Sequence, residues 1–275
     1  MEIGCEFRRE SFRGARMITR REIREKAREF GVPVSTIERD YAQNWLLKPL
    51  SSVNMVLKGG TGIRKAYIGD YRFSDDLDFT LLEMVVKEEL EAVIEGSVKK
   101  VKEESGINFS EDIKFQENDN GFEIDVYFQI MQGGGSRTKI KIDITKSENE
   151  EILLPLNMKR IIHPYSDDLK VEVRVYSLEE IMAEKMRSLF QRTRPRDLYD
   201  VWCLYSKVDK RRILHIFWEK CGFKDIKINI KDFENRKKDF KEAWESSLRY
   251  QLRDLPEFKM VFSTVLKEVK KCAER

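Results

Sequence analysis

Apolar side chains recur at helical spacing near the beginning of the chain, between residues 17 and 48. Thr19 followed by Glu22 forms a capping box, which predicts the start of a first helix. After a glycine-containing break, Ser35 with Glu38 repeats the device and predicts the start of a second helix. The pair is similar in layout to a DNA-binding helix-turn-helix, but its second helix ends in apolar residues. We therefore favour a hairpin that packs on the rest of the protein.

Strand signals dominate from residue 51 to residue 176. Short segments rich in β-branched and aromatic residues predict strands within residues 53–57, 77–82, 122–130, 138–145 and 171–176. The segment 82–106 has helical periodicity and ends on a glycine, which predicts a helical crossover. The glycine-rich tract 132–136 predicts a hairpin loop between two of the strands.

Helical periodicity returns after residue 176 and continues to the end of the chain. We therefore expect an α/β (α+β) fold, in which a mixed sheet with flanking helices is followed by a helical C-terminal domain. The expected organisation is an N-terminal helical segment that packs on the core, the core itself and the helical domain, over residues 1–50, 51–176 and 177–275.

Composition narrows the chemistry. Of the 275 residues, 41% are hydrophobic, and 37% are charged, against about 25% in an ordinary globular protein. The 52 basic and 49 acidic residues nearly cancel, which argues against binding polyanions over the whole surface and favours a heat-adapted surface of ion pairs. Only two histidines and four widely spaced cysteines argue against a polyhistidine metal site, a Ser-His-Asp hydrolase and a zinc ribbon. No apolar leader or long apolar run is visible, so we expect a soluble, cytoplasmic protein without a membrane partner.

A glycine-rich turn is the first candidate for chemistry. An apolar run leads into Lys58-Gly59-Gly60-Thr61, and a short basic helix is expected over residues 62–67. Glycines at a strand-to-helix turn let backbone N–H groups approach a phosphate, and the start of a helix adds a favourable field. The turn is not a P-loop, because the pattern G-x-x-x-x-G-K-[ST] is absent.

An acidic pair follows the turn after a short spacer. Asp76 and Asp78 alternate with apolar residues, so on a strand both carboxylates point to the same face. They lie about 7 Å apart along such a strand and would repel each other unless a cation lies between them. Carboxylate oxygens and substrate phosphates are the ligands that Mg²⁺ prefers. A solvated strand end is the alternative interpretation of this pair taken alone.

The turn and the acidic pair together resemble the DNA polymerase β-like nucleotidyltransferase superfamily, in which a Gly-Gly-Ser/Thr turn precedes Asp-x-Asp by a similar spacer. Longer segments resemble one branch, the AbiEii/AbiGii-type nucleotidyltransferase toxins, and read ERDYAQNWLL, LKGGTGIRKAY, RFSDDLDFT, IKIDIT and AEKMRSLFQRTRPRDLYDVW. The resemblance extends from about residue 35 to residue 204. It implies a polymerase-β-like core for the expected sheet.

The resemblance also implies roles for individual residues. Asp76 and Asp78 match the metal-binding pair of the family, and the implied metal is Mg²⁺, or alternatively Mn²⁺. The residues that it places at the nucleotide are Lys58, Gly59, Gly60, Thr61, Arg72 and Lys185.

A third metal-binding carboxylate is implied on a neighbouring strand, and two residues compete for the role. Asp143 lies within 138–145 and shares its face with lysines, whereas Asp125 lies within 122–130 with the same alternation. We favour Asp143, because it matches the family segment and its face is basic. The other residue would then be a structural surface carboxylate.

Lys185 is unusual for its position on the helix predicted to begin at Ser177. It follows Leu178 by seven residues and Ile181 by four, so it lies on the apolar stripe of that helix. Lysine is almost never buried without a partner, although its stem can also extend along an apolar face to water. The resemblance implies that Lys185 contacts the nucleotide phosphates.

The segment after it, Arg-Pro-Arg-Asp-Leu-Tyr-Asp, predicts a helix that begins at Pro195 and carries Asp197 and Asp200 on one face. Asp197 matches a catalytic carboxylate of the family, which would orient Lys185 or bind the nucleotide. Pairing with nearby arginines is the alternative.

The function implied by the resemblance is transfer of a nucleoside monophosphate from an NTP to an acceptor hydroxyl, with catalytic roles for Asp76, Asp78, Asp143, Lys185 and Asp197. The implied acceptor is the 3′ end of a tRNA, and the implied partner is a cognate antitoxin protein. Two alternatives remain at this point: the same reaction on a protein or a small molecule, or a non-enzymatic protein that binds DNA through its first two helices.

Overall fold

A mixed sheet forms the centre of the protein in the computed structural model, which describes residues 17–131 and 137–273. Within these residues the sheet has eight strands in the order β3-β5-β6-β2-β1-β8-β7, and β4 also pairs with β5. The strands are β1 (Met55–Lys58), β2 (Asp76–Leu81), β3 (Asn108–Phe109), β4 (Lys114–Glu117), β5 (Gly121–Gln129), β6 (Thr138–Thr145), β7 (Asn157–Arg160) and β8 (Glu172–Val175). The pairs β1–β8 and β2–β6 are parallel and the other pairs are antiparallel, so the mixed α/β fold is confirmed.

The five strands predicted from the sequence are β1, β2, β5, β6 and β8. The short strands β3, β4 and β7 were not predicted, because two to four residues are too few to show a periodicity. The antiparallel pairing of β5 with β6 confirms the predicted hairpin, while the tract 132–136 itself lies outside the described residues.

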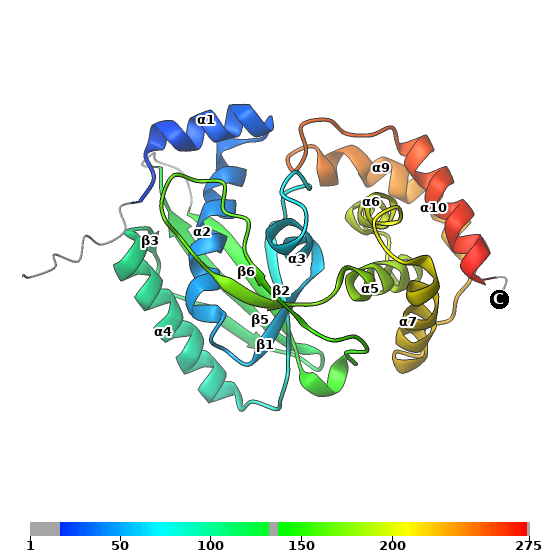
Figure 1. Ribbon diagram of the computed structural model, residues 1–275, viewed down its shortest axis with the longest axis horizontal. Helices are drawn as coiled ribbons and strands as arrows, with labels where there is room; N and C mark the ends of the chain where they lie inside the picture. The colour runs from blue at the N-terminus through cyan, green and yellow to red at the C-terminus, as the bar shows by residue number, and fades with distance from the viewer. Residues whose placement is uncertain (1–16, 132–136, 274–275) are drawn as a thin grey trace, which may run out of the picture.

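Helices cover the sheet and form a separate cluster beside it (Figure 1). They are α1 (Arg20–Phe30), α2 (Val34–Leu50), α3 (Gly59–Ala66), α4 (Lys87–Ser105), the 3₁₀ turn η1 (Ser147–Asn149), α5 (Leu178–Gln191), α6 (Pro195–Leu204), α7 (Lys210–Phe223), α8 (Ile230–Asn235), α9 (Lys237–Leu248) and α10 (Phe258–Ala273). The predicted crossover helix therefore begins at Lys87, five residues later than its pattern suggested. No helix of the described residues is long and apolar enough to cross a membrane.

The cap predicted from the sequence is present at the start of α1 but not at the start of α2. Thr19 accepts a hydrogen bond from the Glu22 N–H at the start of α1, as predicted. The prediction that Ser35 caps the second helix was wrong, because Pro33, two residues earlier, occupies the cap position of α2 and no side chain caps the helix. The carboxylate of Glu38 instead accepts a hydrogen bond from the Met131 N–H at 2.8 Å.

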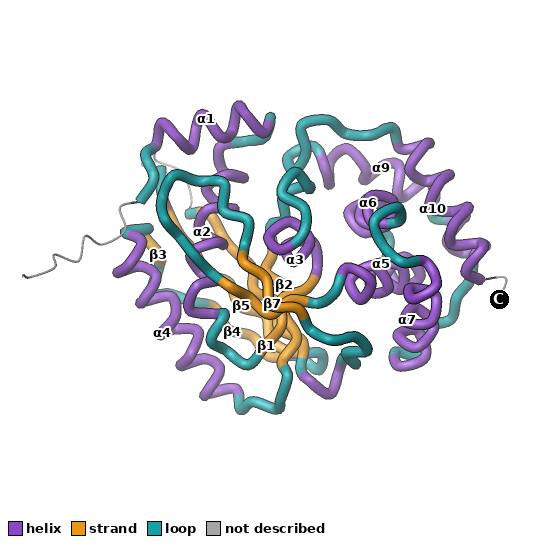
Figure 2. The backbone as a smooth tube through the Cα atoms, in the orientation of Figure 1, coloured by secondary structure: helices purple, strands orange, loops and turns teal. Residues whose placement is uncertain are grey.

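The sheet separates two apolar cores because its side chains alternate between faces. Met55 and Leu57 of β1 point into the core that also contains α1, α2 and α4, whereas Val56 points into the core of the C-terminal helices. Figure 2 shows the strands between these two groups of helices. The helical cluster thus reaches the sheet along β1, next to the turn that begins at Lys58.

Helix α2 is almost entirely enclosed. Twelve of its 17 residues are buried, so it has no face free to enter a DNA groove. The first two helices therefore form the packing hairpin that we favoured, and the DNA-binding alternative loses its structural basis.

Asp40 of α2 is the centre of a buried ion-pair cluster. Its Oδ1 lies 2.6 Å from Lys65 Nζ and 3.0 Å from Arg64 Nε, both on α3, and its Oδ2 accepts a hydrogen bond from the Tyr165 hydroxyl at 2.8 Å. Burial by itself would raise the pKa of Asp40, but the charges of Lys65 and Arg64 lower it to about 2. The cluster fixes α2 against the helix that carries the glycine turn.

We predict that Asp40→Asn lowers the free energy of unfolding by about 3–5 kcal/mol at pH 7, because the Lys65 ammonium is left buried without its carboxylate. Since the pKa of Asp40 is lower in the folded protein than in the unfolded chain, its contribution is complete above about pH 4 and is lost as the pH falls towards 2. Urea unfolding across this range measures the difference between variant and wild type, which should narrow with acid. Asp168→Asn, at an exposed ion pair with Lys170, is the matched control and should change stability by less than about 0.5 kcal/mol. Equal effects of the two substitutions would contradict the assignment.

Candidate active site

The glycine turn joins the end of β1 directly to α3. Helix α3 begins at Gly59 and not at residue 62 as predicted, so both glycines belong to its first turn. Gly59 has a φ of 68°, and a Cβ there would lie 2.3 Å from Asp78 Oδ2, while one on Gly60 would lie 2.7 Å from Arg72 Nη2. The glycines are therefore required because a carboxylate and a guanidinium press against the start of the helix.

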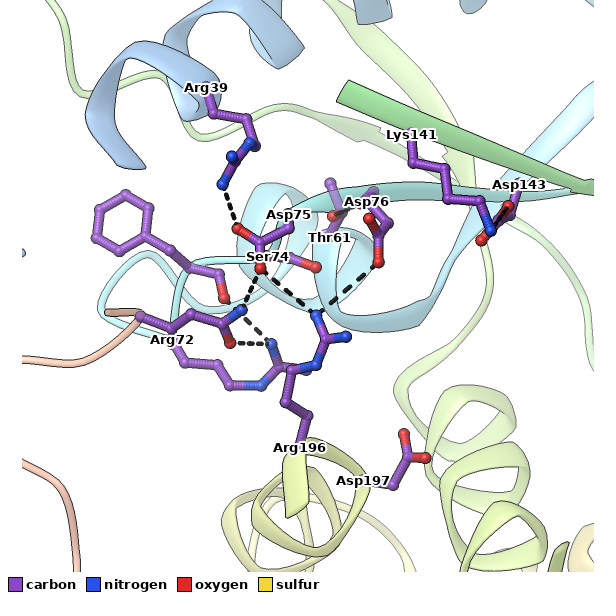
Figure 3. Close-up of polar contacts among 12 residues, drawn as sticks. Arg39, Thr61, Arg72, Ser74, Asp75, Asp76, Lys141, Asp143, Arg196 and Asp197 are labelled. Carbon is purple, nitrogen blue, oxygen red and sulfur yellow. Dashed lines mark hydrogen bonds and ion pairs between the residues drawn. The ribbon is translucent and has the colours of Figure 1, made fainter. Parts of the chain in front are cut away.

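Thr61 has a different neighbourhood from the two glycines. Its side chain is buried, and its hydroxyl donates a hydrogen bond to the backbone carbonyl of Asp76. This contact fastens the beginning of β2 to α3 (Figure 3). Thr61 thus positions the acidic pair, and it does not line the cavity described below.

The acidic residues form rows across neighbouring strands. Asp76 and Asp78 share one face of β2, and the parallel register places Asp143 of β6 beside Asp78. On the other side of Asp78 lies Lys58 of β1. The next row pairs Asp76 with Lys141 of β6. The structure therefore brings the predicted pair and the favoured third carboxylate onto one patch of the sheet. Figure 3 shows Asp76 and Asp143 of this patch.

The proximity of these carboxylates changes their ionisation. Burial, reinforced by the negative charge of Asp78, raises the pKa of Asp76 to about 6. Burial also raises the pKa of Asp143, although the Lys141 ammonium, 2.9 Å from its Oδ1, acts in the opposite direction. Asp143 Oδ1 is buried, and its charge is paired with the Lys141 ammonium. Such a patch favours the binding of a cation.

Asp125 lies one strand farther away. It is on β5, opposite Lys141 in the register, and its Oδ2 lies 3.0 Å from Lys139 Nζ. It does not line the cavity that Asp143 lines. The geometry thus matches the preference for Asp143, and the metal-ligand assignment itself remains a prediction.

A cavity of about 400 Å³ lies between this patch of the sheet and the helices α5 and α6. Its lining contains most of the residues predicted from the sequence: Lys58, Gly59, Gly60, Arg72, Asp76, Asp78, Asp143, Lys185 and Asp197. Thr61 is the exception. Residues far apart in the chain thus share one polar cavity large enough for a small ligand.

Lys185 finds its partners on the neighbouring helix. Its Nζ lies 2.7 Å from Asp197 Oδ1 and 2.9 Å from Asp200 Oδ2. Burial by itself would lower the pKa of Lys185, but the two carboxylates raise it, so the side chain is firmly cationic. Asp197 also pairs with Arg192 Nε at 2.9 Å. Asp197 thus contacts both the lysine and an arginine, and its role in orienting Lys185 or binding a nucleotide stays a prediction.

Arg72 is held inside the protein. Its Nε and Nη2 donate to the two carboxylate oxygens of Asp200 at 2.6 and 2.7 Å, and its Nη1 donates to Gln251 Oε1 and to the Phe73 carbonyl. Of the five N–H groups of its guanidinium, at most one is left for a ligand in the cavity. Arg72 therefore joins the segment before β2 to the helical region, and contact with a nucleotide remains a prediction.

Several residues that line the cavity were not singled out from the sequence, among them Lys141, Glu184, Arg187 and Arg196. Lys141 had a signal, since it alternates with Asp143 on the same face of β6. The other three had none, because their positions depend on how α5 and α6 meet the sheet.

The residues present suit a divalent metal ion chemically. The carboxylates of Asp76, Asp78 and Asp143 line one cavity, and carboxylate oxygens are the ligands that Mg²⁺ prefers. In residues 17–131 and 137–273, however, no group of three or more His, Cys, Asp or Glu side chains is arranged to hold an ion as it stands. Lys141 lies against Asp143, and Arg196 lies near Asp76, so these cations must move aside for an ion to bind.

Comparison with known proteins agrees with this geometry. Residues 43–268 match the family model of the nucleotidyl transferase AbiEii toxin, type IV toxin-antitoxin system. The fold is similar to that of MenT4, a nucleotidyltransferase toxin from Mycobacterium tuberculosis, with a TM-score of 0.64 and 18% identity over 94% of this chain and 90% of that chain. An H. pylori protein named as a nucleotidyltransferase has a TM-score of 0.57 and 19% identity over 87% of this chain and 95% of that chain. A comparison with curated proteins found no match.

These likenesses confirm the nucleotidyltransferase fold expected from the sequence. The family match spans most of the chain and includes the glycine turn, the acidic strand and the segment around Asp197. The protein belongs to the AbiEii family of nucleotidyl transferase toxins of type IV toxin-antitoxin systems.

Proposed function

We propose that the protein transfers a nucleoside monophosphate from an NTP to an acceptor hydroxyl in a reaction that depends on a divalent metal ion, Mg²⁺ or Mn²⁺. The observation that carries this proposal is the row formed by Asp78 and Asp143 beside Asp76, directly next to the glycine turn. The enclosing cavity also contains the Lys185 ammonium. An acidic metal site thus faces a cationic site across a space that a triphosphate can occupy.

Each part of the cavity then has a chemical task. The N–H groups of Gly59 and Gly60, at the start of α3, would hold phosphate oxygens together with Lys58. Lys185 would stabilise the negative charge that develops on the leaving pyrophosphate. The carboxylates of Asp76 and Asp78 on β2 and of Asp143 on the neighbouring β6 would hold the metal ions. When bound, such ions stabilise both the attacking and the leaving oxygen of the α-phosphate.

Asp197 would act through Lys185. Its Oδ1 lies 2.7 Å from Lys185 Nζ, and its Oδ2 pairs with Arg192 Nε at the same time. The ion pair keeps the lysine from extending freely into solvent. Burial opposes ionisation of Asp197, but Lys185 and Arg192 lower its pKa well below the usual range. The carboxylate therefore stays ionised and keeps the lysine oriented throughout the neutral pH range.

For the acceptor we propose the 3′ end of a tRNA, and for the partner a cognate antitoxin protein. The family to which the chain belongs supports the antitoxin. Arg194, an exposed residue in the lining of the cavity, offers a positive charge at its edge for an acceptor phosphate. A protein or a small molecule remains the alternative acceptor.

The direct test is incubation of the protein with each NTP in turn, labelled at the α-phosphate, with Mg²⁺ or Mn²⁺ and either total cellular RNA or total cellular protein. Gel electrophoresis should show label on RNA of tRNA size. Label on protein would replace the acceptor and keep the reaction class. Absence of label in every arm, with each metal, would overturn nucleotidyl transfer.

We predict that Asp76→Asn abolishes metal-dependent transfer while the fold survives. The raised pKa of Asp76 means that its charge is unfavourable in the folded protein at pH 7, so the neutral amide should leave stability unchanged or raise it by up to about 2 kcal/mol. A transfer assay run beside a thermal melt measures both quantities. Loss of activity together with a large fall in melting temperature would mean that Asp76 is structural.

The competition between the two candidate third carboxylates yields a further prediction. Asp143→Ala should remove transfer, whereas Asp125→Ala should retain most of it, because only Asp143 lies beside Asp78 and lines the cavity. Both substitutions remove an aspartate that pairs with a lysine of β6, so each is the control for the other. Equal loss in both variants, or loss only in Asp125→Ala, would reverse the assignment.

A further inference from the structure

Arg196 connects the helical region to the acidic strand. It lies in the first turn of α6, and its Nη1 is 3.5 Å from Asp75 Oδ2 and 3.8 Å from Asp76 Oδ2. Figure 3 shows its side chain extending from α6 to the beginning of β2, while Asp197, the next residue, lies on another side of the helix. The guanidinium thus lies beside a carboxylate of the predicted metal site.

Two other arginines of the cavity, Arg72 and Arg187, are held firmly by carboxylates outside the acidic row. Arg72 is bound to Asp200, and Arg187 is bound to Glu150 through Nη2 at 2.7 Å. Arg196 is held less tightly. Its distances to carboxylate oxygens exceed hydrogen-bond length, and its side chain is 29% exposed. Its attraction to Asp76 is therefore real but weak enough to be replaced.

Asp75 does not depend on Arg196. Its Oδ1 accepts a hydrogen bond from Arg39 Nη1, and its Oδ2 accepts one from Gln251 Nε2 at 2.6 Å. If Arg196 moves away, Asp75 therefore remains paired, and Asp76 is the carboxylate whose charge is set free. The neighbouring Asp197 anchors the first turn of α6, so the motion requires only the long side chain of Arg196.

We propose that Arg196 is an exchangeable counter-ion of the acidic site, a positioning residue that neutralises Asp76 until a divalent ion binds and then turns to the phosphates of the nucleotide. This inference rests on the proposed function and adds a residue to it. Arg196 lines the same cavity as Gly59 and Gly60, so the phosphates would lie within its range of motion. A planar guanidinium suits this second role, because it binds phosphate oxygens in pairs.

The test uses two ligands on which Arg196 acts in opposite directions. In calorimetric titrations with Mn²⁺ alone, Arg196→Gln should bind the ion about fivefold more tightly than wild type, since the competing cation is gone. In titrations with Mg²⁺ and inorganic tripolyphosphate, the same variant should bind about tenfold more weakly, since one charge-assisted contact is lost. A purely structural role would weaken both or neither.

Two further variants separate the causes. Arg212→Gln removes the same charge from an exposed position on α7 and should leave Mn²⁺ affinity within about twofold of wild type. Arg196→Lys keeps the charge without the planar fork, so it should retain the Mn²⁺ affinity of wild type and lose part of the tripolyphosphate affinity.

The outcomes also separate this inference from the proposed function. If wild type binds Mn²⁺ and Arg196→Gln binds it equally or more weakly, the counter-ion role of Arg196 is wrong while the metal site stands. An equal gain in Arg212→Gln would attribute the effect to net charge and would likewise overturn the inference. Failure of wild type to bind Mn²⁺ at all would overturn the proposed metal site and the role of Arg196 together.

Discussion

Repulsion between carboxylates on neighbouring strands is the interaction around which the site is arranged. Asp78 of β2, Asp143 of β6 and Glu123 of β5 lie in one row across the sheet. Like charges placed directly opposite one another destabilise a sheet. The row is tolerated because Lys58 lies at one end and Lys141 contacts both Asp143 and Glu123, at 2.9 and 2.8 Å. The folded protein can hold this concentration of negative charge because these cations balance it.

The helical region supplies the opposite charges, and a buried carboxylate holds them in place. Asp200 of α6 is fully buried and binds both Arg72, from the segment before β2, and Lys185 of α5. Burial of Asp200 opposes its ionisation, but these two cations lower its pKa. Removing Asp200 would leave the buried Arg72 guanidinium without the carboxylate that pairs with it. The cavity therefore depends on contacts between the sheet and the helices as much as on either alone.

A second cluster contributes Glu150 and Arg187 to the lining of the cavity. Lys220 of α7 is buried and lies 2.6 Å from Glu180 and 3.2 Å from Glu150, which follows the turn η1. Glu150 also pairs with Arg187 of α5. The loop after β6 is thus tied to two helices of the C-terminal region. Together, the clusters around Asp200 and Lys220 explain how a cavity lined by so many charges keeps a defined shape.

Local sequence alone determined the elements and the chemistry of the site. Alternation placed Asp76 and Asp78 on one face of β2, and capping predicted the starts of α1 and α5 because these effects act within a few residues. The Gly59-Gly60 turn was visible for the same reason, since it combines a residue type with a strand-to-helix junction. Only the tertiary structure showed that Asp143, and not Asp125, lies beside Asp78, because strand order and register depend on pairing between distant segments. It also decided that Lys185 faces Asp197 and Asp200, that Thr61 turns to a backbone carbonyl, and that Arg196 reaches Asp76. Those contacts join parts of the chain whose relative placement is set by packing between the sheet and the helices, and packing leaves no periodic pattern in a single sequence.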